Sequence, residues 1–158
     1  MTLPTGVQSI AENNYGRPDQ ALGYLQRMTR AFGYALPGSM YEVSPDYGMF
    51  AQAWTLYSYA IPLVKQFFGV RSVASKKQVR IQPQMPTAWD KAQLKDITVG
   101  NNRLDVQYNY MEGALKMNIA QTQSDWQIQW AFPHQKYKSW QINGKEGVSK
   151  TNRRFRCF

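Results

Sequence analysis

Cysteine and histidine are almost absent from this sequence. Of its 158 residues, one is a cysteine, Cys157, and one is a histidine, His134. A single cysteine excludes an internal disulfide and a cage of cysteine ligands around a metal, and a single histidine excludes sites that need a histidine pair. We therefore expect no metal and no other cofactor, and we interpret His134 as an ordinary loop residue.

The sequence also lacks a membrane span and an amino-terminal signal. Its longest strongly apolar run, residues 53–70, contains Lys65, Gln66 and several tyrosines, which argues against a transmembrane helix. The first residues include Pro4 and Gly6 and do not show the basic and apolar pattern of a secretory signal. We expect no membrane partner. The compartment stays open, and a bacterial periplasmic or extracellular location is compatible with the sequence.

Acidic residues are scarce, and the resulting positive charge is unevenly distributed. The chain has 19 basic and 10 acidic residues, for a net charge of +9. Residues 1–70 contain four of each sign, so residues 71–158, with fifteen basic and six acidic residues, carry the whole excess. A basic surface invites binding to nucleic acid. However, the basic residues alternate with apolar ones, as on the solvated face of a sheet, and no recognition helix is present. We expect no nucleic-acid partner.

The remaining composition, with 43% hydrophobic residues and five tryptophans, is that of a folded protein. In the first seventy residues the apolar spacing predicts three helices: one that ends at Gly16, one from Pro18 to Gly33, and one over residues 49–68. The apolar face of the first carries Val7, Ile10 and Ala11. The third is apolar on nearly every side, which is typical of a helix inside a larger assembly, and Pro62 is expected to kink it. Residues 1–70 therefore resemble the end of a helical unit.

Beyond residue 75 apolar and polar residues alternate, which is the period of a β-strand. About six short strands follow, separated by the turn sequences Gly100-Asn101-Asn102, Glu112-Gly113, Ser124-Asp125 and Asn143-Gly144. Residues 82–89 contain two prolines and are expected to form an extended connector. Short antiparallel strands at near-regular spacing predict a β-sandwich over residues 71–158.

The segment 36–54 joins the second predicted helix to the third and contains two carboxylates, Glu42 and Asp46, of which we interpret Asp46 as a helix cap or loop bracket. Prolines stiffen this segment, and Gly38 and Gly48 allow sharp bends. Aromatic residues lie near Glu42 in the sequence: Tyr34, Tyr41, Tyr47 and Phe50. Loops that place one carboxylate among aromatic rings are common where enzymes handle sugars, and also where a loop simply packs.

The order of these parts resembles one group of enzymes. The sequence PGSMYE ends at Glu42, FAQAW ends at Trp54, FFG ends at Gly69, and QPQMPTAW fills the connector. Together they resemble the C-terminal end of the six-hairpin, (α/α)6-barrel glycoside hydrolases, closest to bacterial α-L-rhamnosidase-like and glycogen-debranching-like enzymes. The likeness covers about residues 3–145. It implies the last three helices of an α/α barrel in residues 1–70, followed by a C-terminal β-sandwich in residues 71–158.

The resemblance also implies a reaction. In these enzymes the catalytic base is a glutamate in the loop before the last barrel helix, and that position is Glu42 here. Glycosidic hydrolysis with inversion also needs a general acid, which lies far upstream in these families and has no counterpart in this chain. The isolated chain is therefore expected to be inactive. Hydrogen bonds from Tyr41, Tyr47 or backbone near Gly48 are expected to keep Glu42 ionised.

Sugar contacts follow from the same resemblance. The rings of Tyr34, Tyr41 and Tyr47 are expected to stack on the C–H faces of an oligosaccharide or polysaccharide substrate. Trp54 fits a sugar subsite and also, more simply, the helical core. The apolar helices are expected to expose a patch that a missing N-terminal barrel segment or a second copy of the chain covers.

Each of these residues can also be explained by an ordinary structural role. A carboxylate beside a helix, such as Glu42, is more often a surface group than a catalytic one. Trp126 and Trp130 share one strand face with Ile128 and Phe132, which predicts a sandwich core, although an exposed aromatic surface for carbohydrate stays open. The rival to the hydrolase hypothesis is a stand-alone carbohydrate-binding or structural module.

Overall fold

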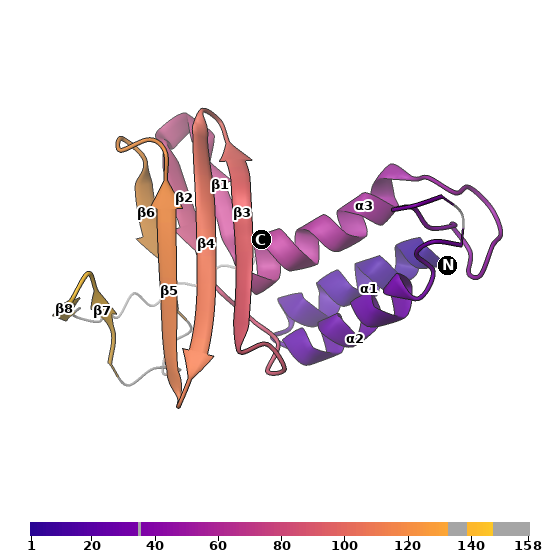
Figure 1. Cartoon of the computed structure of the whole chain (residues 1–158), viewed down its shortest axis with the longest axis horizontal. Coiled ribbons are helices and arrows are strands. Elements are labelled where there is room, and N and C mark those ends of the chain that lie inside the picture. The colour runs from indigo at the N-terminus through magenta and orange to yellow at the C-terminus, as the bar shows by residue number, and fades with distance from the viewer. Residues whose placement is uncertain (35, 133–138, 147–158) are drawn as a thin grey trace.

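The computed structural model describes residues 1–34, 36–132 and 139–146. Helices gather at one end of the molecule and strands at the other (Figure 1). The helices come first along the chain: α1 (Thr2–Asn14), α2 (Pro18–Thr29) and α3 (Ala53–Ala60), followed by the π-helical segment Ile61–Phe67. No helix within these ranges is long and apolar enough to cross a membrane.

The third predicted helix changes its hydrogen bonding at Pro62. α3 ends at Ala60, and the π-helical segment follows, in which the Phe68 N–H donates to the carbonyl of Leu63 at 3.2 Å. Proline has no N–H to donate, and a π-helical turn is one way for a helix to accommodate the interruption. Pro62 was predicted to kink the helix, and the α-helical hydrogen bonding does end just before it. The predicted start at residue 49 is wrong, because the helix begins at Ala53.

Small and polar residues fill the buried face of α1: Thr2, Gly6, Ser9, Glu12 and Asn13. Gly6 lies so close to α3 that a Cβ atom at this position would be 2.0 Å from Ser58 Oγ. Val7, Ile10 and Ala11 lie on α1 as predicted, but this apolar face is not the one that is buried, and Val7 is 49% exposed. α1 and α3 instead approach each other through small residues.

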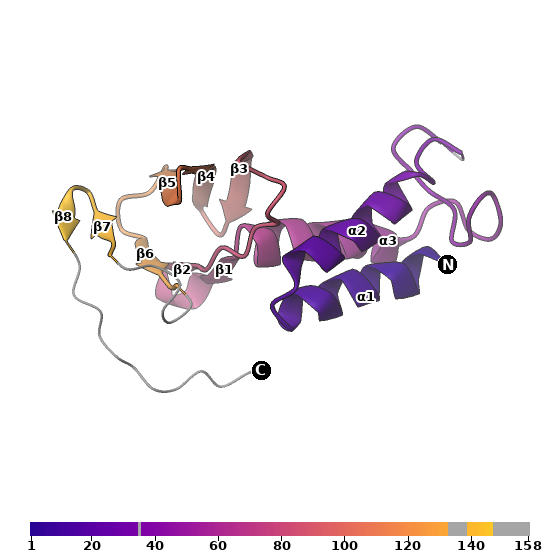
Figure 2. The same ribbon diagram turned by 90° about the horizontal axis from the view of Figure 1, so that it is seen from below.

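The strands form two sheets of three and one hairpin. One sheet has the order β1–β2–β6 and contains β1 (Val70–Val73), β2 (Gln78–Ile81) and β6 (Gln127–Trp130). The other has the order β3–β4–β5 and contains β3 (Lys91–Val99), β4 (Asn102–Met111) and β5 (Ala114–Gln121). The hairpin pairs β7 (Gln141–Ile142) with β8 (Lys145–Glu146). Figure 2 shows the two three-stranded sheets as separate layers.

The predicted turns lie where the chain reverses. Met111 pairs with Ala114 across Glu112-Gly113, and Ile142 pairs with Lys145 across Asn143-Gly144. The two turn residues have positive φ in both cases, between 51° and 79°, as a two-residue type I′ turn requires. Residues 82–89 contain no strand, as their prolines predicted.

One hydrophobic core joins the helices to the strands. Its buried members come from α2, from the end of the π-helical segment, and from both three-stranded sheets: Ala21, Leu22, Leu25, Phe67, Val79, Ile81, Leu104 and Val106 among them. Gly69 allows the chain to pass from helix to strand, because it has a φ of +68° and lies against the Gln82 backbone. A Cβ atom there would be 1.9 Å from the Gln82 carbonyl oxygen.

This architecture is a small α+β domain, and the expected barrel end followed by a β-sandwich is wrong. The described residues form three α-helices and eight short strands in sheets of three, three and two. α2 and Phe67 pack into the same core as the strands, so the helices are not arranged as part of a helical barrel. β6 pairs in parallel with β2, which departs from the antiparallel sandwich that the spacing predicted.

Candidate functional site

The loop that carries Glu42 is fixed at its backbone. The Glu42 N–H donates to the carbonyl of Met49 at 2.8 Å, and the Glu42 carbonyl accepts the Thr2 N–H at 2.8 Å. Val43 and Tyr47 exchange two backbone hydrogen bonds, of 2.9 and 3.0 Å, which closes the loop between them. The loop is therefore tied both to itself and to the first turn of α1.

The Glu42 side chain is half-buried and lies across Gly48. A Cβ atom at Gly48 would be 2.9 Å from Glu42 Oε2 and 3.1 Å from Glu42 Cβ. Gly48 also has a φ of +80°, a conformation that side chains other than glycine rarely adopt. Gly48 therefore both makes the bend and leaves room for the carboxylate.

The hydrogen bonds expected at this carboxylate are not formed by the described residues. Tyr47 is 76% exposed, and neither it nor Tyr41 donates to Glu42. The expectation is wrong because the short turn between Val43 and Tyr47 uses the backbone of Tyr47 and leaves its side chain in solvent. Glu42 is thus positioned by backbone contacts and by the shape of Gly48.

The aromatic residues predicted to bind sugar lie on the same loop and the start of α3, and are largely exposed. Tyr34 is 58% exposed, Trp54 is 47% exposed, and Tyr41 is half-buried. The Trp54 Nε1–H donates to the side-chain carbonyl of Gln52, which fixes the indole beside the FAQAW segment. The two best-defined cavities among the described residues do not include these side chains or Glu42. The loop brings the predicted residues to one end of the molecule.

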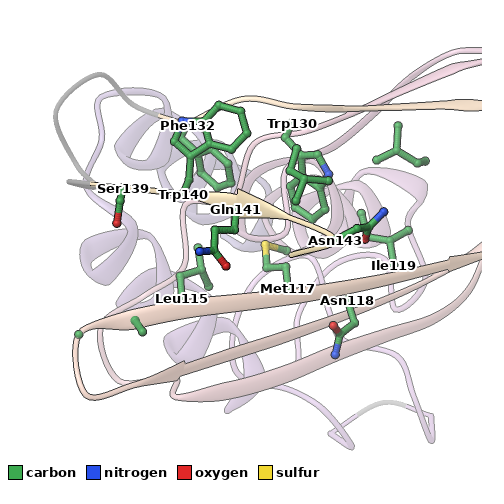
Figure 3. Close-up of a pocket in the computed structure, with 14 residues that line it drawn as sticks. Leu115, Met117, Asn118, Ile119, Trp130, Phe132, Ser139, Trp140, Gln141 and Asn143 are labelled. Carbon is green, nitrogen blue, oxygen red and sulfur yellow. The ribbon is translucent and has the colours of Figure 1, made fainter. Parts of the chain in front are cut away.

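A cavity with a volume of about 1040 Å3 lies elsewhere, between β5, β6 and β7. Figure 3 shows it, and we call it the β-cleft. Apolar side chains from β5 and β6 form its floor: Leu115, Met117, Ile119 and Ile128. β5 and β6 are the outer strands of their respective sheets, so strand pairing in the described residues leaves the space between them open.

Aromatic rings and amides border the β-cleft. The rings of Trp130 and Phe132 are nearly parallel, with an interplanar angle of 9° and centroids 6.0 Å apart. Trp140 lies near them, and the side chain of Gln141 extends towards β5 (Figure 3). Asn143, in the turn after β7, completes this border.

The two tryptophans that were predicted to form core have different surroundings. Trp126 is 4% exposed, and its Nε1–H donates to Asn101 Oδ1 at 3.0 Å, so its assignment to the core is confirmed. Trp130 packs against the core but is only half-buried, and it lines the β-cleft. Alternation along a strand identifies which residues share a face. It does not reveal whether another layer covers that face, so the sequence did not predict the cleft.

Two titratable groups outside these sites have shifted pKa values. Burial raises the pKa of the Tyr59 hydroxyl above its ordinary value. A hydrogen bond from Lys77 holds the pKa of the Asp125 carboxyl below its ordinary value. Within the described ranges no three His, Cys, Asp or Glu side chains are grouped as a metal site would need. His134 and Cys157 lie outside the described residues.

Comparison of the chain with protein-family models, with curated proteins and with solved structures finds no match.

Proposed function

We propose that this chain is a component of a glycoside hydrolase in which Glu42 acts as the general base. The observation that carries the proposal is the placement of the Glu42 carboxylate, which is held across Gly48 by a fixed loop that also carries exposed aromatic residues. The PGSMYE and FAQAW segments, which resemble those of glycoside hydrolases, lie in this loop, and FAQAW continues into the first residues of α3.

Glu42 would supply only one of the two catalytic groups that glycosidic hydrolysis needs, the general base. In an inverting hydrolysis a carboxylate removes a proton from water while a carboxylic acid protonates the leaving oxygen, and the two groups lie about 6.5–9.5 Å apart. Asp46 is the other acidic residue of this loop, and it is exposed to solvent. The sequence offers no counterpart of the general acid, so the acid has to come from outside this chain. Natural glycosides, whose leaving group needs protonation, should not be cleaved by the chain alone.

Glycosyl fluorides provide the test, because fluoride leaves without needing a general acid. The full chain is incubated with the α- and β-anomers of glucosyl and L-rhamnosyl fluoride, and fluoride release is measured with an ion-selective electrode. Although the chain is expected to be inactive on natural glycosides, whose leaving group needs the missing general acid, we expect slow release of fluoride above the rate in buffer. Glu42→Gln should reduce it by about 100-fold or to the rate in buffer, since a general base contributes about 10²–10⁴-fold.

Asp46→Asn is the matched control, because it removes an exposed carboxylate from the same loop and should leave the rate unchanged. NMR of the first product would identify the anomer, and inversion is expected. Equal fluoride release by wild type and Glu42→Gln, or no release from any of the fluorides, would contradict the proposal.

A further inference from the structure

We infer that the β-cleft is a second binding site, for a neutral oligosaccharide, separate from the loop that carries Glu42. The cleft is formed by β5, β6 and β7, whereas the Glu42 loop joins α2 to α3 at the other end of the molecule (Figure 1). The inference does not depend on Glu42 being catalytic.

The size of the cleft indicates the size of the ligand. Pockets for small molecules have volumes of about 300–1,000 Å3, and the β-cleft, with about 1040 Å3, lies just above this range. It is open between two outer strands, so a chain of several units can lie along it. Both features favour an oligosaccharide over a single sugar.

The border of the cleft indicates the ligand's chemistry. Sugar rings have apolar C–H faces and a rim of hydroxyl groups, and they bind where a flat aromatic surface adjoins hydrogen-bonding side chains. Trp130 and Phe132 provide nearly parallel rings, and Trp140 adds a third aromatic side chain. The amides of Gln141 and Asn143 contain both donors and acceptors, as hydroxyl groups require. Polar and apolar atoms thus both line the cleft.

The absence of charge decides between classes of polymer. Although the chain has a net charge of +9, none of the described residues that line the cleft is acidic or basic. The described lining residues offer no cation to pair with the anionic groups of a nucleic acid or a sulfated polysaccharide, and binding to such polymers depends strongly on Lys and Arg. The cleft therefore suits a neutral ligand.

Isothermal titration calorimetry of the full chain against maltohexaose, cellohexaose and mannohexaose tests the inference. At least one of them should bind, and Trp130→Ala and Trp140→Ala should each weaken that binding by tenfold or more. Trp130→Phe keeps an aromatic face and should retain most of the affinity. Circular dichroism and the unfolding temperature of each variant separate loss of binding from loss of folding.

Two control variants keep this test separate from the test of Glu42. Tyr15→Ala removes an exposed aromatic ring at the end of α1, outside both sites, and Glu42→Gln removes the proposed base. Neither should alter the affinity. Lack of binding to all three hexasaccharides, equal affinity in wild type and a folded Trp130→Ala variant, or equal weakening by Tyr15→Ala would each overturn the inference. Fluoride hydrolysis by Glu42 would be unaffected by any of these outcomes.

Discussion

Tyr59 is the residue whose environment makes the clearest prediction about pH. Its hydroxyl donates to the Leu25 carbonyl at 3.5 Å, its ring packs against Phe32, and burial raises its pKa. The pKa of a tyrosine in the unfolded chain is near 10, which is lower than the pKa of Tyr59 in the folded chain. As the pH rises, Tyr59 therefore loses its proton first in the unfolded state. The contribution of Tyr59 to the free energy of unfolding is fully present below about pH 10 and falls above it.

We expect wild type to lose stability relative to Tyr59→Phe between pH 9 and pH 11. The phenylalanine variant has no proton to lose, and near pH 8 it should differ from wild type by only about 1 kcal/mol, for one hydrogen bond. Urea unfolding at a series of pH values measures the difference, in which the titration of the other tyrosines cancels. Parallel stability curves for the two proteins would show that burial does not shift the Tyr59 pKa.

The individual residues of the Glu42 site could be predicted only in part. The PGSMYE sequence pointed to Glu42, and its neighbour Gly48 was expected to bend the loop, as it does with a φ of +80°. Contacts from residues distant in the sequence could not be foreseen. The hydrogen bond between Thr2 and Glu42 spans 40 positions, and no local pattern contains that information.

At the scale of elements, the contact between α1 and α3 depends on one glycine. Gly6→Ala would place its Cβ atom 2.0 Å from Ser58 Oγ and 2.1 Å from Ser58 Cβ, so one helix would have to move. We expect a loss of about 1–3 kcal/mol in the free energy of unfolding, as for other overpacked sites. Chemical denaturation monitored by circular dichroism measures this loss.

Gly23→Ala is the matched control for Gly6→Ala. Gly23 lies in α2, and a Cβ atom there would meet nothing within 4 Å, so the variant should gain about 0.5–1 kcal/mol from helix propensity. Ser58→Gly removes the atoms nearest to the added methyl group, so Gly6→Ala should cost less in that background. Additive effects of Gly6→Ala and Ser58→Gly would exclude this packing contact as the cause.

The type and position of most strands could be predicted, although β1 (Val70–Val73) was not expected, but the way in which the strands pair could not. A period of two and the turns at Glu112-Gly113 and Asn143-Gly144 depend on local residues, and they are found where expected. The pairing of β2 with β6 joins residues such as Val79 and Ile128, which are distant in the sequence. Side-chain alternation is the same in parallel and antiparallel strands, so the spacing alone could not predict this pairing.

For the whole molecule, α3 presents its apolar side outwards. The residues that it buries are small and polar, Thr55 and Ser58. Its solvent face carries Ala53, Leu56, Tyr57 and Ala60, at the i, i+3, i+4 and i+7 spacing with which a helix packs against another helix. Leu56 is 70% exposed and Tyr57 is 48% exposed. We call these four residues the α3 stripe.

Charge favours a second copy of the chain as the partner of the α3 stripe. Residues 1–70 have no net charge, and the whole +9 belongs to residues 71–158. The helices and the strands lie at opposite ends of the molecule (Figure 1), so two copies that pack through α3 keep their basic ends apart. Trp54, Met49 and Phe50, all about half-exposed, extend the apolar surface beside the stripe. Exposed apolar surfaces of this kind often mark interaction sites.

We therefore expect wild type to form a dimer in sedimentation-velocity experiments at tens of micromolar, and Leu56→Glu to weaken the dimer by at least tenfold. A glutamate on the α3 stripe would place like charges together across a two-fold axis, where the same surface meets itself. Met111→Glu is the control, because Met111 is 55% exposed at the end of β4, among the strands. It should not change the association.

Three outcomes of this experiment lead to different conclusions about the α3 stripe. A dimer that Leu56→Glu disrupts and Met111→Glu does not would place the interface on α3. Equal disruption by both variants would instead show that net charge controls association, since each change lowers the net charge of +9 by one. A wild-type monomer at these concentrations would leave the stripe in water and rule out a second copy as its partner.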